Sequence, residues 1–209
     1  MLMKSFYKVV FLIFFIFNVN ASDVSALNEG TTTIQFNNNN LYFYGPVSSE
    51  SSFQLKNKLE ELDIQSQSIA MQFSIDPPPI HLHIQSFGGS LLHTFHLVDM
   101  IKSLKTPVYT YIDGFAASAA TLISVSGKKR FISDNSIMLV HQLSSASSGK
   151  FNEMKDEYDN LVGFMDIIKK IYLSNSKIPK EQLEKLLAQD IWLDSSKALQ
   201  YGFVDKILK

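Results

Sequence analysis

Apolar residues recur along this chain in two alternating patterns, with a period of two residues in short runs and of about 3.6 residues in longer ones. The short runs predict strands, at 41–44, 80–84, 108–112, 131–132, 137–140, 191–193 and 204–207. The longer runs predict helices, at 53–62 with a less regular continuation to 75, 91–104, 118–125, 151–173, 179–187 and after Asp194. Strands that alternate with helices predict an α/β fold.

The first 40 residues carry neither pattern in full. Two lysines precede an apolar run at 9–17, and Val19 and Ala21 follow it. This order is typical of a secretory signal peptide cleaved after Ala21. The run is shorter than the roughly 20 residues of a membrane-spanning helix, and an uncleaved anchor or an organelle-targeting leader is the alternative. We expect secretory, periplasmic or organellar targeting, with a signal peptide-like leader at 1–21, a polar mobile segment at 22–40 without packed elements, and one domain at 41–209.

Composition excludes several kinds of chemistry. The chain has no cysteine, so disulfides, thiolate catalysis and cysteine-bound zinc are ruled out. The formal net charge is −1 and the basic residues are scattered, which argues against a nucleic-acid partner. The sequence has no Gly-x-x-x-x-Gly-Lys-Ser/Thr phosphate loop, so any ATP would be used by a separate protein. The 209 residues are enough for a single domain.

Two segments could serve serine-based acyl transfer, which needs a hydroxyl, a base, an orienting carboxylate and amide donors for an oxyanion. Ser118 stands among small residues where a strand is expected to turn into a helix, through a turn opened by Gly114. Most such serines are helix caps or packing residues. The pair Gly88 and Gly89 follows a buried strand and would let the backbone run beside a ligand. An ordinary strand-to-helix turn uses glycines in the same way.

The base and the carboxylate have candidates further along the chain. His141 ends the apolar strand 137–140, where a histidine is more often a structural hydrogen-bonding residue than a base. Asp190 lies between a helix end and the strand 191–193, where aspartate commonly serves a turn. Each residue is therefore ordinary by itself, and only their combination points to catalysis.

Together these segments closely resemble the family of Clp protease proteolytic subunits. The shared motifs are Gly-x-Ala-Ala-Ser at 114–118, Met-x-x-His-Gln at 138–142, and Asp190 before an aromatic strand and a Tyr-Gly-x-x-Asp ending. The resemblance covers residues 41–209. It implies the following roles: nucleophile, Ser118; general base, His141; orienting acid, Asp190; oxyanion hole, the backbone amides of Gly89 and Ala119.

The resemblance also implies an architecture, a substrate class and partners. The fold would be the spiral of ββα units shared by Clp proteolytic subunits and crotonases, with a protruding handle helix at 151–173. The chain would be a serine endopeptidase that cleaves peptides or unfolded proteins without a metal or an organic cofactor. Similar subunits form heptamer-type homo-oligomeric rings and work with a separate AAA+ unfoldase.

Some positions depart from the family pattern. Phe87 replaces the proline of Ser-Pro-Gly-Gly, which affects how a substrate backbone would lie along the strand. Gln189 replaces an arginine that contacts the opposite ring, so stacking of two rings is left open. His81 and His83 replace aromatic residues that face the partner ATPase, so docking of an unfoldase is left open too. A serine-rich segment, 144–149, stands where the family often carries two glycines.

Other functions remain alternatives on the sequence alone. A crotonase-like acyl-CoA enzyme shares the broader fold but generally needs no serine nucleophile. Signal-peptide peptidases would suit the leader, but they use a serine–lysine pair. A ring subunit that has lost its activity is the non-enzymatic alternative. His81 with His83, or His93 with His96, could bind a metal, but no third ligand follows at a telling spacing.

Overall fold

The computed structural model describes residues 32–209 and is built around one mixed sheet. Six strands lie in the order β1-β2-β3-β4-β5-β8, while β6 pairs with β4 and β7 with β6. β1 and β7 run antiparallel to their neighbours, and the other pairs are parallel. The bounds are β1 (Thr33–Asn37), β2 (Asn40–Tyr44), β3 (Ile80–Ser86), β4 (Val108–Ala117), β5 (Lys129–Ser133), β6 (Ile137–Leu139), β7 (Trp192–Asp194) and β8 (Lys206–Leu208).

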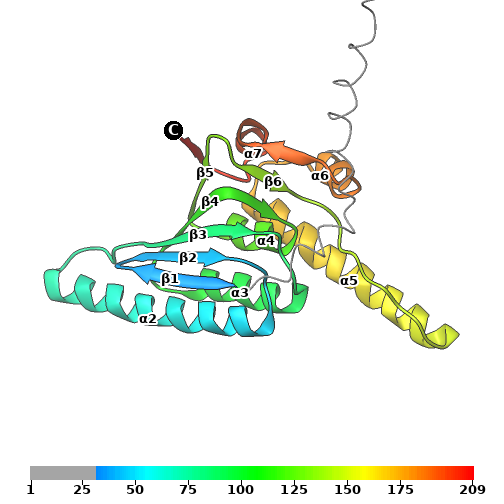
Figure 1. Ribbon diagram of the computed structural model, residues 1–209, viewed down its shortest axis with the longest axis horizontal. Helices are drawn as coiled ribbons and strands as arrows, with labels where there is room; N and C mark the ends of the chain where they lie inside the picture. Colours follow the sequence, from blue (N-terminus) through cyan, green and yellow to red (C-terminus); the bar gives the residue numbers. More distant parts are fainter. Residues whose placement is uncertain (1–31) are drawn as a thin grey trace, which may run out of the picture.

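Helices cover one face of this sheet and one helix leaves the body (Figure 1). α2 and α3 lie side by side beneath the sheet, and α4 follows β4 directly. α6 and α7 lie beside β7, and α5 projects away from the rest. The bounds are α2 (Ser49–Phe73), α3 (Leu91–Ser103), α4 (Ala119–Val125), α5 (Phe151–Asn175), α6 (Lys180–Leu187) and α7 (Ser195–Tyr201). The alternation of strands and helices confirms the α/β class.

The core forms where the apolar faces of strands and helices meet. In β3, Ile80, Leu82 and Ile84 are fully buried, whereas His81 and His83 lie half-buried on the opposite face. The period of two residues therefore separates the two faces of the strand as the sequence predicted. On α2, leucines at helical spacing are fully buried: Leu55, Leu59 and Leu62. α2 continues as a helix to Phe73, through the part whose pattern was less regular.

A hairpin that the sequence pattern did not predict precedes the parallel strands. β1 pairs with β2 from Thr33 opposite Tyr44 to Asn37 opposite Asn40. The connection uses Asn38 at φ 54°, a left-handed conformation that asparagine tolerates well and that tight hairpins require. Part of the segment 22–40, where we expected no packed element, is thus a strand. The expected leader at 1–21 lies outside the described residues.

β4 runs further than the sequence suggested. Gly114 was expected to open a turn, but it stays within β4 at φ 84°. The register between β3 and β4 shifts between Ile84 and Ser86, so the strand bends there and continues to Ala117. A glycine can supply the positive φ that such an irregularity needs. The bend brings the second half of β4 against β6, and this pairing positions the segment that follows β4.

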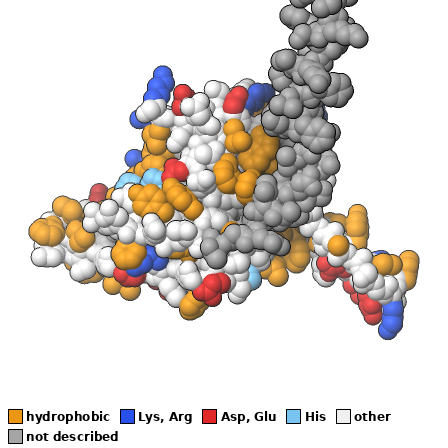
Figure 2. Space-filling view, viewed as in Figure 1, with side chains coloured by type: hydrophobic (Ala, Val, Ile, Leu, Met, Phe, Trp, Pro, Cys, Tyr) orange, Lys and Arg blue, Asp and Glu red, His pale blue; other side chains and the backbone are white. Residues whose placement is uncertain are grey.

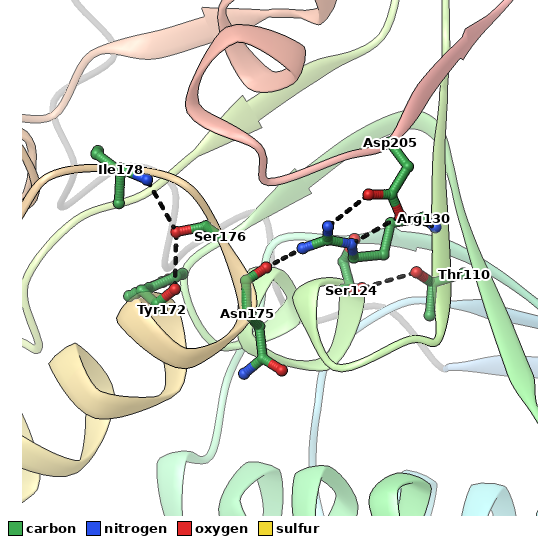
Figure 3. A network of polar contacts seen from close by, with 8 residues as sticks. All are labelled: Thr110, Ser124, Arg130, Tyr172, Asn175, Ser176, Ile178 and Asp205. Carbon is green, nitrogen blue, oxygen red and sulfur yellow. Dashed lines mark hydrogen bonds and ion pairs between the residues drawn. The ribbon is translucent and has the colours of Figure 1, made fainter.

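The C-terminal half of α5 is anchored to the body, whereas its N-terminal half is not. Its buried residues are Ile168, Ile171 and Tyr172, while Phe151 near its start is 77% exposed. Figure 3 shows Arg130 of β5 beside the end of α5, where its guanidinium donates to the carbonyl of Asn175 and pairs with Asp205. The 25-residue helix therefore projects as the handle expected from the resemblance. No helix within residues 32–209 has the length and apolarity needed to span a membrane.

Candidate active site

Ser118 occupies a strained corner between β4 and α4. Its backbone angles are φ 55° and ψ −129°, a combination that costs of the order of 1–3 kcal/mol for a residue with a side chain. Its amide donates to the carbonyl of Leu139 in β6 at 2.9 Å. The nucleophile candidate is thus held at the point where a strand ends and a helix begins, the geometry in which a serine hydroxyl stands clear of its backbone.

Two glycines bring a second backbone segment against this corner. At Gly88 a Cβ atom would lie 2.7 Å from the carbonyl oxygen of Ala117 and 2.8 Å from the amide nitrogen of Ala119. Gly88 also has φ 96°, so both space and conformation require glycine here. At Gly89, with φ 142°, a Cβ would run into the carbonyl oxygen of Val47.

Backbone hydrogen bonds fix the Gly89 segment beside Val47. The Val47 amide donates to Gly88 at 2.8 Å, and its carbonyl accepts from the Ser90 amide at 2.7 Å. These bonds occupy the groups on either side of Gly89, and no backbone carbonyl within the described residues accepts from the Gly89 amide. Ala119 is the first residue of α4, so its amide has no partner within the helix. Both amides are therefore available as donors.

His141 follows β6 and faces Asp190 from the segment before β7. The His141 Nδ1 atom lies 3.4 Å from Oδ1 of Asp190, and the two side chains are 18% and 56% exposed. Burial lowers the pKa of His141, and the Asp190 carboxylate partly opposes that effect. A neutral imidazole with a free Nε2 can accept a proton, so this histidine suits a general base.

One pocket of about 290 Å³ joins these groups. Ser118, His141, Gly89 and Ala119 all line it. Its other walls include apolar side chains from α4 and α5: Leu122, Leu161, Phe164, Ile168 and Tyr172. A hydroxyl, an imidazole and two backbone amide donors thus share a cavity with apolar walls, the combination that acyl transfer needs.

The structure gathers the predicted residues, but neither Ser118 with His141 nor His141 with Asp190 makes a good hydrogen bond. No hydrogen bond between the Ser118 hydroxyl and His141 is present in the described part of the chain, and 3.4 Å between His141 and Asp190 exceeds a good hydrogen bond. Such contacts are often loose before substrate binds and tighten in the Michaelis complex. Thr121 and Tyr172 also lie beside Ser118. Nothing in the sequence indicated this, because both look like ordinary residues of their helices.

The histidines considered as metal ligands make other contacts. His83 Nδ1 lies 2.8 Å from Asp113 and His81 Nδ1 lies 2.7 Å from the Tyr111 hydroxyl. His93 bonds the Ser90 hydroxyl at 2.6 Å. Within residues 32–209 no group of three histidine, aspartate or glutamate side chains is placed to hold a metal ion.

A larger cavity, of about 640 Å³, lies away from Ser118. It is lined by residues around the C-terminal ends of α3, α4 and α5, with Arg130 and four lysines: Lys102, Lys105, Lys128 and Lys177. Cations are favoured at helix C-termini because the backbone dipoles carry negative charge there. The helix C-termini therefore account for the cations around this cavity. The cavity contains none of the residues proposed for catalysis.

Comparisons with known proteins show the family of the chain. The family model for Clp protease matches residues 37–209. The chain is 31% identical to the ATP-dependent Clp protease proteolytic subunit of Streptococcus sanguinis, over 79% of this chain and 82% of that protein. It is 32% identical to proteolytic subunit 2 of Treponema denticola, over 70% of this chain and 74% of the other.

A solved structure of a Clp protease subunit shares the fold of this chain. A ClpP1 mutant from Listeria monocytogenes superposes with a TM-score of 0.70 at 25% identity, covering 82% of this chain and 92% of that one. The spiral of ββα units expected from the sequence is thereby confirmed. On the family match, the sequence relatives and this shared fold, the chain belongs to the Clp protease family.

Proposed function

We propose that this protein is a serine endopeptidase that hydrolyses peptide bonds in peptides or unfolded proteins. The observation that carries the proposal is the shared pocket: Ser118, His141, Gly89 and Ala119 line one cavity, and His141 lies beside Asp190. Membership of a family whose relatives are named as Clp protease proteolytic subunits supports it.

The reaction would begin at the Ser118 hydroxyl. Its oxygen attacks the carbonyl carbon of the scissile bond while Nε2 of His141 takes the hydroxyl proton. His141 then gives this proton to the leaving amine, and the acyl group stays on Ser118 as an ester. A water molecule, deprotonated by the same histidine, releases the acid product. Asp190 accepts from Nδ1 and keeps the imidazole in the tautomer that has Nε2 unprotonated.

The oxyanion of each tetrahedral intermediate would be held by the amides of Gly89 and Ala119. Both residues line the pocket with Ser118, and both amides lack a backbone acceptor among the described residues. An oxyanion-hole donor typically contributes about 3 kcal/mol of transition-state stabilisation. Glycine is required at 88 and 89 because a Cβ at either position would meet neighbouring backbone, so the segment could not approach Ser118 as closely.

We further propose that the subunits assemble into a homo-oligomeric ring. The projecting part of α5 carries large apolar side chains that are exposed in the single chain: Phe151, Met154, Tyr158 and Val162. Figure 2 shows hydrophobic side chains on the surface of this projecting helix. Exposed apolar surface of this kind marks a site of association. A heptamer-type ring is the expectation from the resemblance, and a separate AAA+ unfoldase is the partner that would supply unfolded substrate.

Fluorophosphonate labelling of the purified full chain tests the peptidase proposal. The wild type should be labelled and should cleave a fluorogenic peptide, and Ser118→Ala should do neither while keeping its circular dichroism spectrum. A Ser118→Ala preparation with full activity would overturn the assignment of the nucleophile. A folded wild type that forms rings but neither labels nor cleaves would instead identify an inactive ring subunit.

A further inference from the structure

The carbonyl of Ser118 accepts from the hydroxyl of Thr121 in α4, and this hydroxyl is in turn hydrogen-bonded to the hydroxyl of Tyr172 in α5. The Thr121 hydroxyl oxygen lies 2.5 Å from the Ser118 carbonyl oxygen and 2.6 Å from the hydroxyl oxygen of Tyr172. The Thr121 amide donates to the same carbonyl at 3.0 Å. Thr121 is fully buried and Tyr172 is 1% exposed, so bulk water does not compete for these bonds.

The direction of both hydrogen bonds follows from the number of protons available. A carbonyl oxygen can only accept, so the single hydroxyl proton of Thr121 is donated to Ser118. Tyr172 must then donate its own proton to the Thr121 oxygen. Burial raises the pKa of the Tyr172 phenol, so the phenol keeps that proton across the working pH range. The sequence of donors runs from Tyr172 through Thr121 to Ser118.

The geometry of the peptide unit carries this restraint to the oxyanion hole. The Ser118 carbonyl and the Ala119 amide belong to one planar trans peptide, in which C=O and N–H point in opposite directions. Fixing the carbonyl therefore fixes the direction of the Ala119 amide. On the other side of Ser118, the amide is held by Leu139 at 2.9 Å. The strained backbone of Ser118 is thus restrained from both sides.

We propose that Thr121 and Tyr172 are positioning residues: the Thr121 hydroxyl holds the Ser118 carbonyl, the Tyr172 hydroxyl holds Thr121, and together they aim the Ala119 amide at the oxyanion. The inference rests on the proposed peptidase function and deepens it. An amide that is misaimed weakens stabilisation of the transition state more than binding of the substrate, because the charge develops only in the transition state. Loss of either hydroxyl should therefore lower kcat and leave KM nearly unchanged.

Three variants of the full-length protein test this. Tyr172→Phe keeps the ring and removes only the donor, and it should lower kcat about 10-fold with KM within about twofold of wild type. Thr121→Val removes the hydroxyl that bonds both Ser118 and Tyr172, and it should lower kcat further than Tyr172→Phe does. Thr121→Ser keeps the hydroxyl and should retain most of the wild-type rate. Fluorophosphonate labelling rates should follow kcat, and the acid limb of the pH profile should not move, because His141 is untouched.

A matched control separates positioning from packing. Thr110 is also fully buried and donates its hydroxyl proton to the carbonyl of Ser124, 2.7 Å away, a contact drawn in Figure 3. Thr110→Val removes the same kind of bond from another turn of α4, so it should lower the melting temperature as the test variants do and leave kcat intact.

Two results would overturn the inference. The first is a wild-type kcat for both Tyr172→Phe and Thr121→Val, and the second is an equal loss of kcat for Thr110→Val. An active wild type with either result leaves the peptidase proposal standing. A folded wild type that neither labels nor cleaves overturns the peptidase proposal, and this inference with it.

Discussion

The Nδ1 atom of His141 and the Oδ1 atom of Asp190 are 3.4 Å apart, although the aspartate side chain is more than half exposed. A carboxylate in contact with water stabilises an imidazolium less than a buried one, because the solvent screens its charge. In the proposed mechanism, the main contribution of Asp190 would therefore be to set the tautomer and orientation of the imidazole.

Asp190→Asn should therefore reduce kcat strongly without unfolding the protein. In trypsin-like enzymes the equivalent change costs about 10⁴-fold, and the longer, exposed contact here predicts a smaller loss, of about 10²- to 10³-fold. Peptidase kinetics and a thermal melt on the same sample measure both effects. A rate close to wild type would show that another carboxylate, or none, orients His141.

The pH profile should reflect the environment of His141. Burial lowers the pKa of His141 below the ordinary value of 6.5, and the Asp190 carboxylate opposes this shift. In the proposed mechanism the neutral imidazole is the base, so kcat/KM should rise with pH and level off on the acid side of neutrality. Removal of the opposing charge in Asp190→Asn should move the acid limb to still lower pH. An acid limb above pH 6.5 in the wild type would contradict the assignment.

Gly88→Ala should damage both stability and activity. Its Cβ would lie within 2.8 Å of backbone atoms of Ala117 and Ala119, at a φ of 96°. We expect a loss of at least about 2 kcal/mol in the free energy of unfolding, together with loss of labelling. Unfolding in urea measures this change in the free energy of unfolding.

Gly163→Ala is the control for this prediction. A Cβ at Gly163, within α5, would meet nothing within 4 Å. Since alanine is the better helix former, this change should stabilise the protein by about 0.5–1 kcal/mol and leave labelling unchanged. Equal destabilisation by both variants would show that the close approach at Gly88 is not the cause.

Native mass spectrometry of residues 22–209 should show a multi-subunit species. Tyr158→Glu places a charge on the exposed apolar side of α5, where Tyr158 is 66% exposed, and should shift the mass to smaller assemblies. Tyr158→Phe keeps the apolar surface and is the matched control. A monomeric wild type that cleaves peptides at full rate would limit the family likeness to the active site.

The N-terminus of the protein isolated from its native source should be Ser22. The basic start, apolar run and Val19-x-Ala21 motif predict cleavage after Ala21. Edman sequencing decides between this outcome and an intact Met1 in a membrane fraction, which would favour an anchor.

The sequence by itself determined most of the elements and the candidate chemical groups. Alternation in 80–84 separated buried aliphatic residues from the histidines, and the structure confirms that separation. The motifs around Ser118, His141 and Asp190 identified the family, since these motifs are short and lie in fixed order. Local periodicity and short motifs are readable because they depend on neighbours in the chain.

Only the tertiary structure decided how these groups are held. Thr121 and Tyr172 are 51 positions apart, and no local pattern indicates that their hydroxyls meet beneath Ser118. The run of β4 through Gly114 is likewise set by its neighbours β3 and β6 rather than by its own residues. Such contacts depend on packing between distant elements, which overrides local preference. That packing fixes the strained backbone at Ser118 and therefore the direction of the Ala119 amide.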